Sequence, residues 1–107
     1  MESKALIVLC TCPDQDSAER LANHLIKNRL AACVNITPPV KSVYRWQGEI
    51  ETADEVMLFI KTGTSSYDEL EQTILSLHPY ELPEVIAVPV DKGQQNYLGW
   101  ITQCTNN

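Results

Sequence analysis

The sequence predicts an α+β fold, a ferredoxin-like βαββαβ sandwich, in one domain that spans residues 1–107. Apolar strand patterns that begin at residues 5 and 55 are each followed by an amphipathic helix pattern and then by a second strand. A chain of 107 residues is also too short to build two separate cores. Two βαβ units of this kind interleave in one antiparallel sheet, with both helices on one face.

The first unit opens with an apolar run over residues 5–12 that ends before a proline and is typical of a strand buried on both faces. Asp16 and Glu19 resemble a capping box, and the apolar residues after them follow helical spacing, so we expect a helix to begin there. Residues 31–37 return to an extended pattern, which two prolines end.

The second unit is preceded by an extended hairpin over residues 41–52, in which Gln47 and Gly48 form the turn. Residues 55–61 then predict a separate buried strand. A second capping box, from Ser66 to Glu69, predicts a helix that ends where a proline follows His78.

The chain closes with a strand over residues 85–90 and a short helix that begins near Asn96. Pro89 lacks a backbone donor, so this strand is expected at an edge of the sheet. The first and third strands are apolar on both faces, but the two long helices cover only one face. We therefore expect the chain to form an oligomer.

Charge and hydropathy exclude several classes of function. Eight Lys and Arg against 14 Asp and Glu give a net charge of −6, which disfavours nucleic acid and anionic membrane surfaces as partners. The longest apolar run, residues 5–10, is too short to span a bilayer, so no membrane role is expected. We find no secretory signal pattern and expect a cytoplasmic protein whose four cysteines stay reduced.

The predicted topology brings Cys10 and Cys12, near the end of the first strand, beside the loop that carries His78 and Glu84. Thiol, imidazole and carboxylate are ligands for copper or zinc, so we predict a divalent-metal site with Cys10, His78 and Glu84 as ligands and Cys12 as a second choice. The alternatives stay open: Cys10 as a buried filler, His78 as a helix cap and Glu84 as a solvated charge.

Tyr44 and Trp46 share one face of the predicted hairpin and are either a packing stripe or, as we prefer, an interface between subunits. The four glycines are scattered and form no phosphate-binding loop, and no GxSxG motif is present. We therefore predict no catalytic residues and no enzymatic activity.

Several strings along nearly the whole chain together resemble the CutA divalent-cation-tolerance family. They are Cys12 to Asp14, Arg29 to Ile36, Ser42 to Gly48, Glu55 to Thr62, His78 to Tyr80, Pro83 to Ile86 and Tyr97 to Trp100.

The resemblance implies a cytoplasmic homotrimer akin in architecture to the PII signalling proteins, with long hairpins at the subunit interfaces. It also implies a role in tolerance to copper and other divalent cations, with Cys10 and His78 as copper ligands. Leu77 stands where some relatives carry a second histidine. The leading hypothesis is a trimeric metal-binding protein, and the alternative is a PII-like trimer that signals or binds a small molecule without a dedicated metal role.

Overall fold

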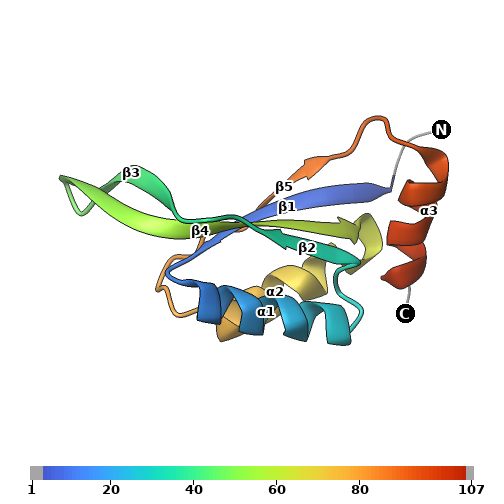
Figure 1. Ribbon diagram of the computed structural model, residues 1–107, viewed down its shortest axis with the longest axis horizontal. Helices are drawn as coiled ribbons and strands as arrows, with labels where there is room; N and C mark the ends of the chain where they lie inside the picture. Colours follow the sequence, from blue (N-terminus) through green and yellow to red (C-terminus); the bar gives the residue numbers. More distant parts are fainter. Residues whose placement is uncertain (1–3, 106–107) are drawn as a thin grey trace.

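One five-stranded antiparallel sheet carries two long helices on the same side (Figure 1). The computed structural model describes residues 4–105. In chain order the elements are β1 (Ala5–Cys12), α1 (Gln15–Lys27), β2 (Cys33–Ile36), β3 (Val40–Trp46), β4 (Glu49–Gly63), the 3₁₀ turn η1 (Thr64–Ser66), α2 (Tyr67–Leu77), β5 (Ile86–Pro89) and α3 (Gln95–Cys104). The predicted α+β class is confirmed.

The strand order β2-β4-β1-β5 places β1 between β4 and β5 and leaves β5 at an edge. Within this register Cys12 lies opposite Val56 and Leu9 lies opposite Ile86. The end of β1 therefore reaches the segment that connects α2 to β5. This is the juxtaposition that the sequence predicted for its candidate metal ligands.

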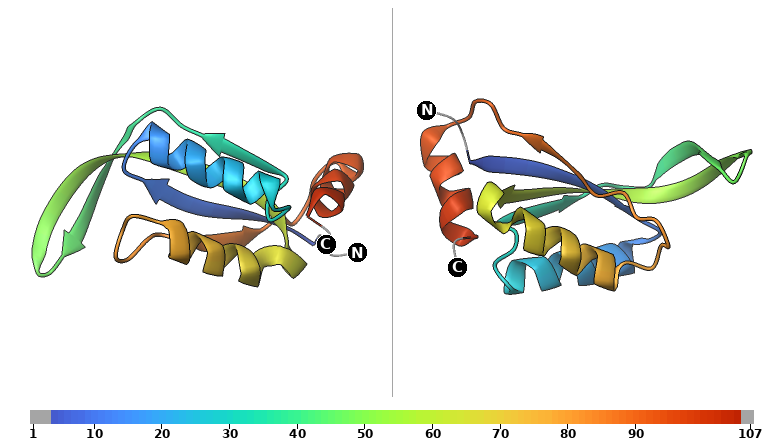
Figure 2. Two further views of the ribbon diagram at one scale, coloured as in Figure 1. Left: turned by 90° about the horizontal axis from the view of Figure 1, so that it is seen from below. Right: turned by 180° about the vertical axis from the view of Figure 1, so that it is seen from behind.

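The hairpin of β3 and the first half of β4 projects from the sheet, at the opposite end of the molecule from α3 (Figures 1 and 2). Its two-residue turn has positive φ at Gln47 (52°) and Gly48 (85°), which matches the twist of antiparallel strands. The expectation of a separate strand over residues 55–61 is wrong. β4 runs without interruption from Glu49 to Gly63 and pairs first with β3 and then with β1 and β2.

The N-termini of the two long helices differ from the predicted capping boxes. Asp14, rather than Asp16, caps α1, because its extended backbone lets its Oδ1 accept the Ser17 N–H at 2.8 Å. Ser66 precedes α2 but makes no side-chain cap. Its hydroxyl instead donates to the Thr105 carbonyl at 2.7 Å, which ties the start of α2 to the end of α3.

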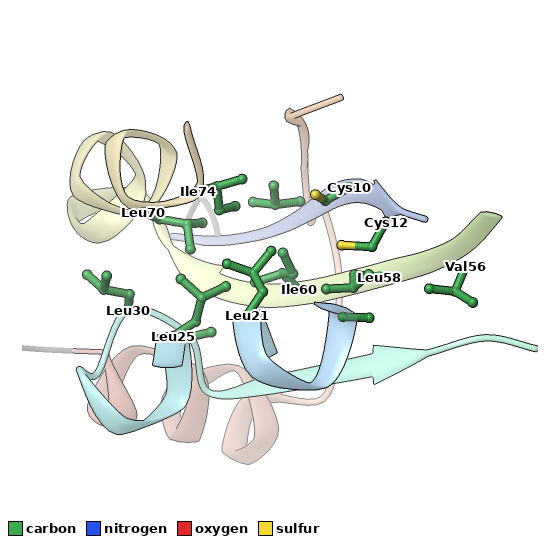
Figure 3. Close-up of a cluster of buried hydrophobic side chains, with 13 residues drawn as sticks. Cys10, Cys12, Leu21, Leu25, Leu30, Val56, Leu58, Ile60, Leu70 and Ile74 are labelled. Atoms are coloured by element: carbon green, nitrogen blue, oxygen red, sulfur yellow. The ribbon is translucent and has the colours of Figure 1, made fainter. Parts of the chain in front are cut away.

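The hydrophobic core fills the space between the sheet and helices α1 and α2 (Figure 3). Its largest fully buried side chains include Val8, Leu25, Leu58, Ile60 and Leu70. Alternate residues along a strand point to opposite faces, so the strand neighbours of these residues point away from both helices. No helix of the described chain, residues 4–105, is long and apolar enough to cross a membrane.

The sheet face turned away from the helices is apolar. Its side chains on β1, β4 and β5 include Ile7, Leu9, Met57, Phe59, Ile86 and Val88, beside the polar Thr11 and Lys61. Ile86 and Val88 remain 57% and 51% exposed, and the views in Figure 2 show α1 and α2 only on the other face. An apolar surface left in water in this way favours association with another chain.

Candidate metal centre

Cys10, Cys12 and His78 come together at one end of the core. The two-residue period of β1 places both thiols on the helix-facing side of the sheet, where Figure 3 shows them beside Leu58. His78 follows the last turn of α2 as its C-cap and brings its ring over the end of β1. One ligand atom from each of the three residues lies within 4.8 Å of the others. The residues are 0%, 1% and 9% exposed, respectively.

Two backbone groups fix the tautomer of His78. The Tyr80 N–H donates to Nδ1 at 3.0 Å, so that nitrogen carries no proton. Nε2 lies 2.7 Å from the Thr11 carbonyl oxygen, which can only accept a hydrogen bond, so Nε2 carries the proton. The same nitrogen is 3.7 Å from the Cys12 sulfur. His78 is therefore neutral here, with its N–H directed toward the end of β1.

The two thiols interact, and their pKa values shift in opposite directions. The hydrogen bond to Cys12, together with burial, raises the pKa of Cys10. The same hydrogen bond from Cys10 lowers the pKa of Cys12, although burial opposes this shift. Cys12 is therefore the first of the pair to become a thiolate, the form that binds metals.

Tyr80 and Glu55 brace the loop that carries His78. The Tyr80 hydroxyl donates to Glu55 Oε2 at 2.7 Å, and the centroids of the His78 and Tyr80 rings are 4.8 Å apart. Burial and the hydrogen bond to Glu55 raise the pKa of Tyr80. The sequence analysis missed this pair, although a glutamate at the start of an apolar strand was an available signal.

The other predicted site residues lie elsewhere. Glu84 is exposed and does not belong to the group of three, although its charge contributes to the raised pKa of Cys10. Tyr44 and Trp46 lie on the same face of the hairpin and are 43% and 36% exposed. All four cysteines are free, and Cys33 lies outside the cluster.

A groove of about 400 Å³ connects the cluster to the surface. It is lined by Cys12 and His78 together with Arg20, Leu21 and His24 of α1. The groove gives a small ion a route toward two donors whose side chains are otherwise enclosed by the core.

The donors of the cluster fit a soft or borderline cation. Thiolate sulfur and imidazole nitrogen are preferred by copper and zinc, whereas magnesium and calcium take oxygen ligands. Metal–ligand bonds of about 2.0–2.3 Å can bridge donors that lie this close together. Cys10 and Cys12 would hold the ion after losing their protons. Nε2 of His78 would join them only after it gives up its proton and its contact with Thr11.

Comparisons with known proteins agree with this chemistry. Residues 6–104 match the family model described as CutA1 divalent ion tolerance protein. The divalent-cation tolerance protein CutA of Thermus thermophilus is 42% identical over 99 residues, which cover 92% of this chain and 96% of the relative.

Solved structures extend the similarity to the fold. A crystal structure of CutA from Xylella fastidiosa has a TM-score of 0.94 and 44% identity, with 97% of this chain and 100% of that chain covered. The structure of a protein from Archaeoglobus fulgidus described as the periplasmic divalent cation tolerance protein CutA has a TM-score of 0.92 and 34% identity, with 95% and 99% covered.

Proposed function

Because this chain belongs to the CutA1 divalent ion tolerance protein family, we propose that it binds copper or another divalent cation and thereby contributes to tolerance of that ion. The observation that carries the proposal is the enclosed group of two thiols and one imidazole, whose ligand atoms lie within 4.8 Å of one another. The proposed role is binding rather than catalysis, in keeping with the prediction of no enzymatic activity.

The electrostatics of the cluster favour a cation. Two thiolates beside a neutral imidazole carry a charge of −2, and an unpaired buried charge of that size is costly unless a cation compensates it. Glu84 adds negative charge nearby and is an outer candidate ligand if its loop moves inward. Since the thiols must deprotonate first, binding releases protons and strengthens as the pH rises.

We further propose a cytoplasmic homotrimer. The apolar sheet face described above supports an assembly in which other subunits cover Phe59, Ile86 and Val88. The half-exposed Tyr44 and Trp46 of the hairpin support a second contact with a neighbouring subunit. The cytoplasmic location rests on the sequence and on the family resemblance, whereas one relative is described as periplasmic.

Titration of the reduced protein with Zn(II) and Cu(II) tests the metal proposal. The Cys10→Ala/His78→Ala variant removes a thiol and the imidazole, and its metal affinity should fall by at least about tenfold. The control Cys33→Ala removes a thiol outside the cluster and should bind like the parent protein. Equal affinities in both variants would contradict the proposed site.

The groove lined by Arg20 and His24 supports a second candidate, a PII-like trimer that binds a small anionic molecule. A thermal-shift screen of small anions would reveal such a ligand as a rise in melting temperature. Loss of that rise in Arg20→Gln, with metal affinity unchanged, would favour this function over metal binding.

A further inference from the structure

We propose that Cys10 and Cys12 by themselves form a two-coordinate site for copper(I), with His78 outside the coordination shell. The inference rests on the proposed function and deepens it, because it names the oxidation state of one cation and divides the cluster into ligands and a supporting residue. Three independent features of the site support it.

The first feature is the placement of the sulfurs. Both thiols project from the same face of β1, and their Sγ atoms lie within 4.8 Å of each other. Two metal–sulfur bonds of about 2.3 Å each span about 4.6 Å when the metal lies between the sulfurs. One strand therefore presents two thiols close enough for a single ion to bridge them.

The second feature is that both ring nitrogens of His78 already have hydrogen-bond partners. Nδ1 accepts from the Tyr80 N–H, and the proton on Nε2 faces the Thr11 carbonyl. Neither nitrogen offers a free lone pair to a metal. With Nε2–H 3.7 Å from the Cys12 sulfur, the ring is instead placed to stabilise negative charge on that sulfur.

The third feature is the largely apolar surroundings of the two buried sulfurs. Cys10 and Cys12 are 0% and 1% exposed, and apolar side chains of the core surround them (Figure 3). Copper(I) is soft and prefers thiolates, and its filled d shell accepts two ligands, so it needs no water at this buried position.

The charge and proton balance is simple. One Cu⁺ replaces the two thiol protons, which pass to solvent, and the product is a bis-thiolate complex with a net charge of −1. No electron is transferred, because the ion that binds is already copper(I). Nε2 of His78 donates to the Thr11 carbonyl but also lies 3.7 Å from the Cys12 sulfur, so the ring can stabilise the residual negative charge without a metal–nitrogen bond.

Anaerobic competition of the reduced protein against the copper(I) chelator bicinchoninate tests the inference. Cys10→Ala and Cys12→Ala each turn a chelating pair into a single ligand and should weaken copper(I) binding at least about 100-fold. His78→Gln keeps an N–H donor but removes the imidazole and should change the affinity by less than about tenfold. Cys33→Ala, a thiol outside the cluster, should leave it unchanged. A loss in His78→Gln as large as in the cysteine variants overturns the inference.

X-ray absorption at the copper edge of the parent protein gives a readout that needs no variant. We expect two sulfur neighbours, whereas a nitrogen or oxygen neighbour in the first shell overturns the inference. Zinc(II) titration in parallel separates it from the proposed function. Binding of zinc(II) without copper(I) defeats this inference alone, binding of copper(I) without any divalent ion defeats the divalent proposal alone, and failure of both ions defeats both.

Discussion

At the residue scale, the contact between Tyr80 and Glu55 is the most directly testable feature of the loop around His78. Tyr80→Phe removes the hydroxyl that donates to Glu55 Oε2 at 2.7 Å and should lower the free energy of unfolding by about 1 kcal/mol. Tyr97→Phe is the matched control, because the Tyr97 side chain is exposed. Urea unfolding at a fixed protein concentration measures both variants, and equal losses would contradict the contact.

The same contact makes a prediction for pH. The pKa of Tyr80 is raised in the folded protein, so the folded state keeps its phenol proton where the unfolded state has lost it. Its contribution to stability is complete below the unfolded value, near pH 10, and declines as the pH rises toward the folded value. Burial and the hydrogen bond to Glu71 also raise the pKa of Tyr67, so ultraviolet titration should show late tyrosine ionisation that is reduced, not abolished, in Tyr80→Phe. A late step of unchanged amplitude in Tyr80→Phe would contradict the raised pKa of Tyr80.

Only part of the site geometry could be predicted at this scale. The thiol, imidazole and carboxylate residue types indicated a metal site, and the strand pairing brought Cys10 and His78 together. The state of His78 depends on the Thr11 carbonyl and the Tyr80 N–H, which are backbone groups without a sequence signature. Cys12 was a second choice in the sequence analysis, but its sulfur lies 3.7 Å from the His78 ring.

At the element scale, two glycines without close neighbours give opposite predictions. Gly48 has φ of 85° in the hairpin turn, and Gly99 lies within α3, and a Cβ added at either meets nothing within 4 Å. Gly48→Ala should destabilise by about 1 kcal/mol, because L side chains disfavour that backbone. Gly99→Ala should stabilise by about 0.8 kcal/mol through helix propensity. The melting temperature measures both effects. A shift of the same sign in the two variants would contradict the turn conformation at Gly48 or the helical position of Gly99.

Hydrophobic periodicity predicted which segments form helices and strands, but not how neighbouring segments join. Residues 49–52 and 55–61 were predicted as two strands separated by Ala53 and Asp54, but these two residues pair with Ser42 and Lys41 of β3 and keep β4 continuous. The sequence predicted Asp16 as the N-cap of α1, whereas the structure has Asp14. Either aspartate could accept the hydrogen bond, and the extended backbone at Asp14 decides between them. Ser66 does not cap α2, because its hydroxyl donates to the carbonyl of Thr105, a residue distant in the sequence at the end of α3.

At the scale of the whole molecule, the apolar sheet face predicts an assembly that one substitution can disrupt. Ile86→Glu puts a charge in this face and should convert the proposed trimer to monomers in sedimentation equilibrium. Leu75→Glu is the matched control, because Leu75 is 47% exposed on α2, in the other layer of the molecule. A trimer that survives Ile86→Glu, or one that Leu75→Glu also dissociates, would contradict a subunit interface on this face.

The central claim is that the buried cluster of Cys10, Cys12 and His78 binds a divalent cation. X-ray absorption at the zinc edge of reduced protein loaded with one equivalent of Zn(II) tests it most directly. The account predicts two sulfur neighbours and at least one nitrogen neighbour in the first shell, and loss of the sulfur signal in Cys10→Ala/Cys12→Ala. A first shell of oxygen and nitrogen alone in the parent protein would contradict it.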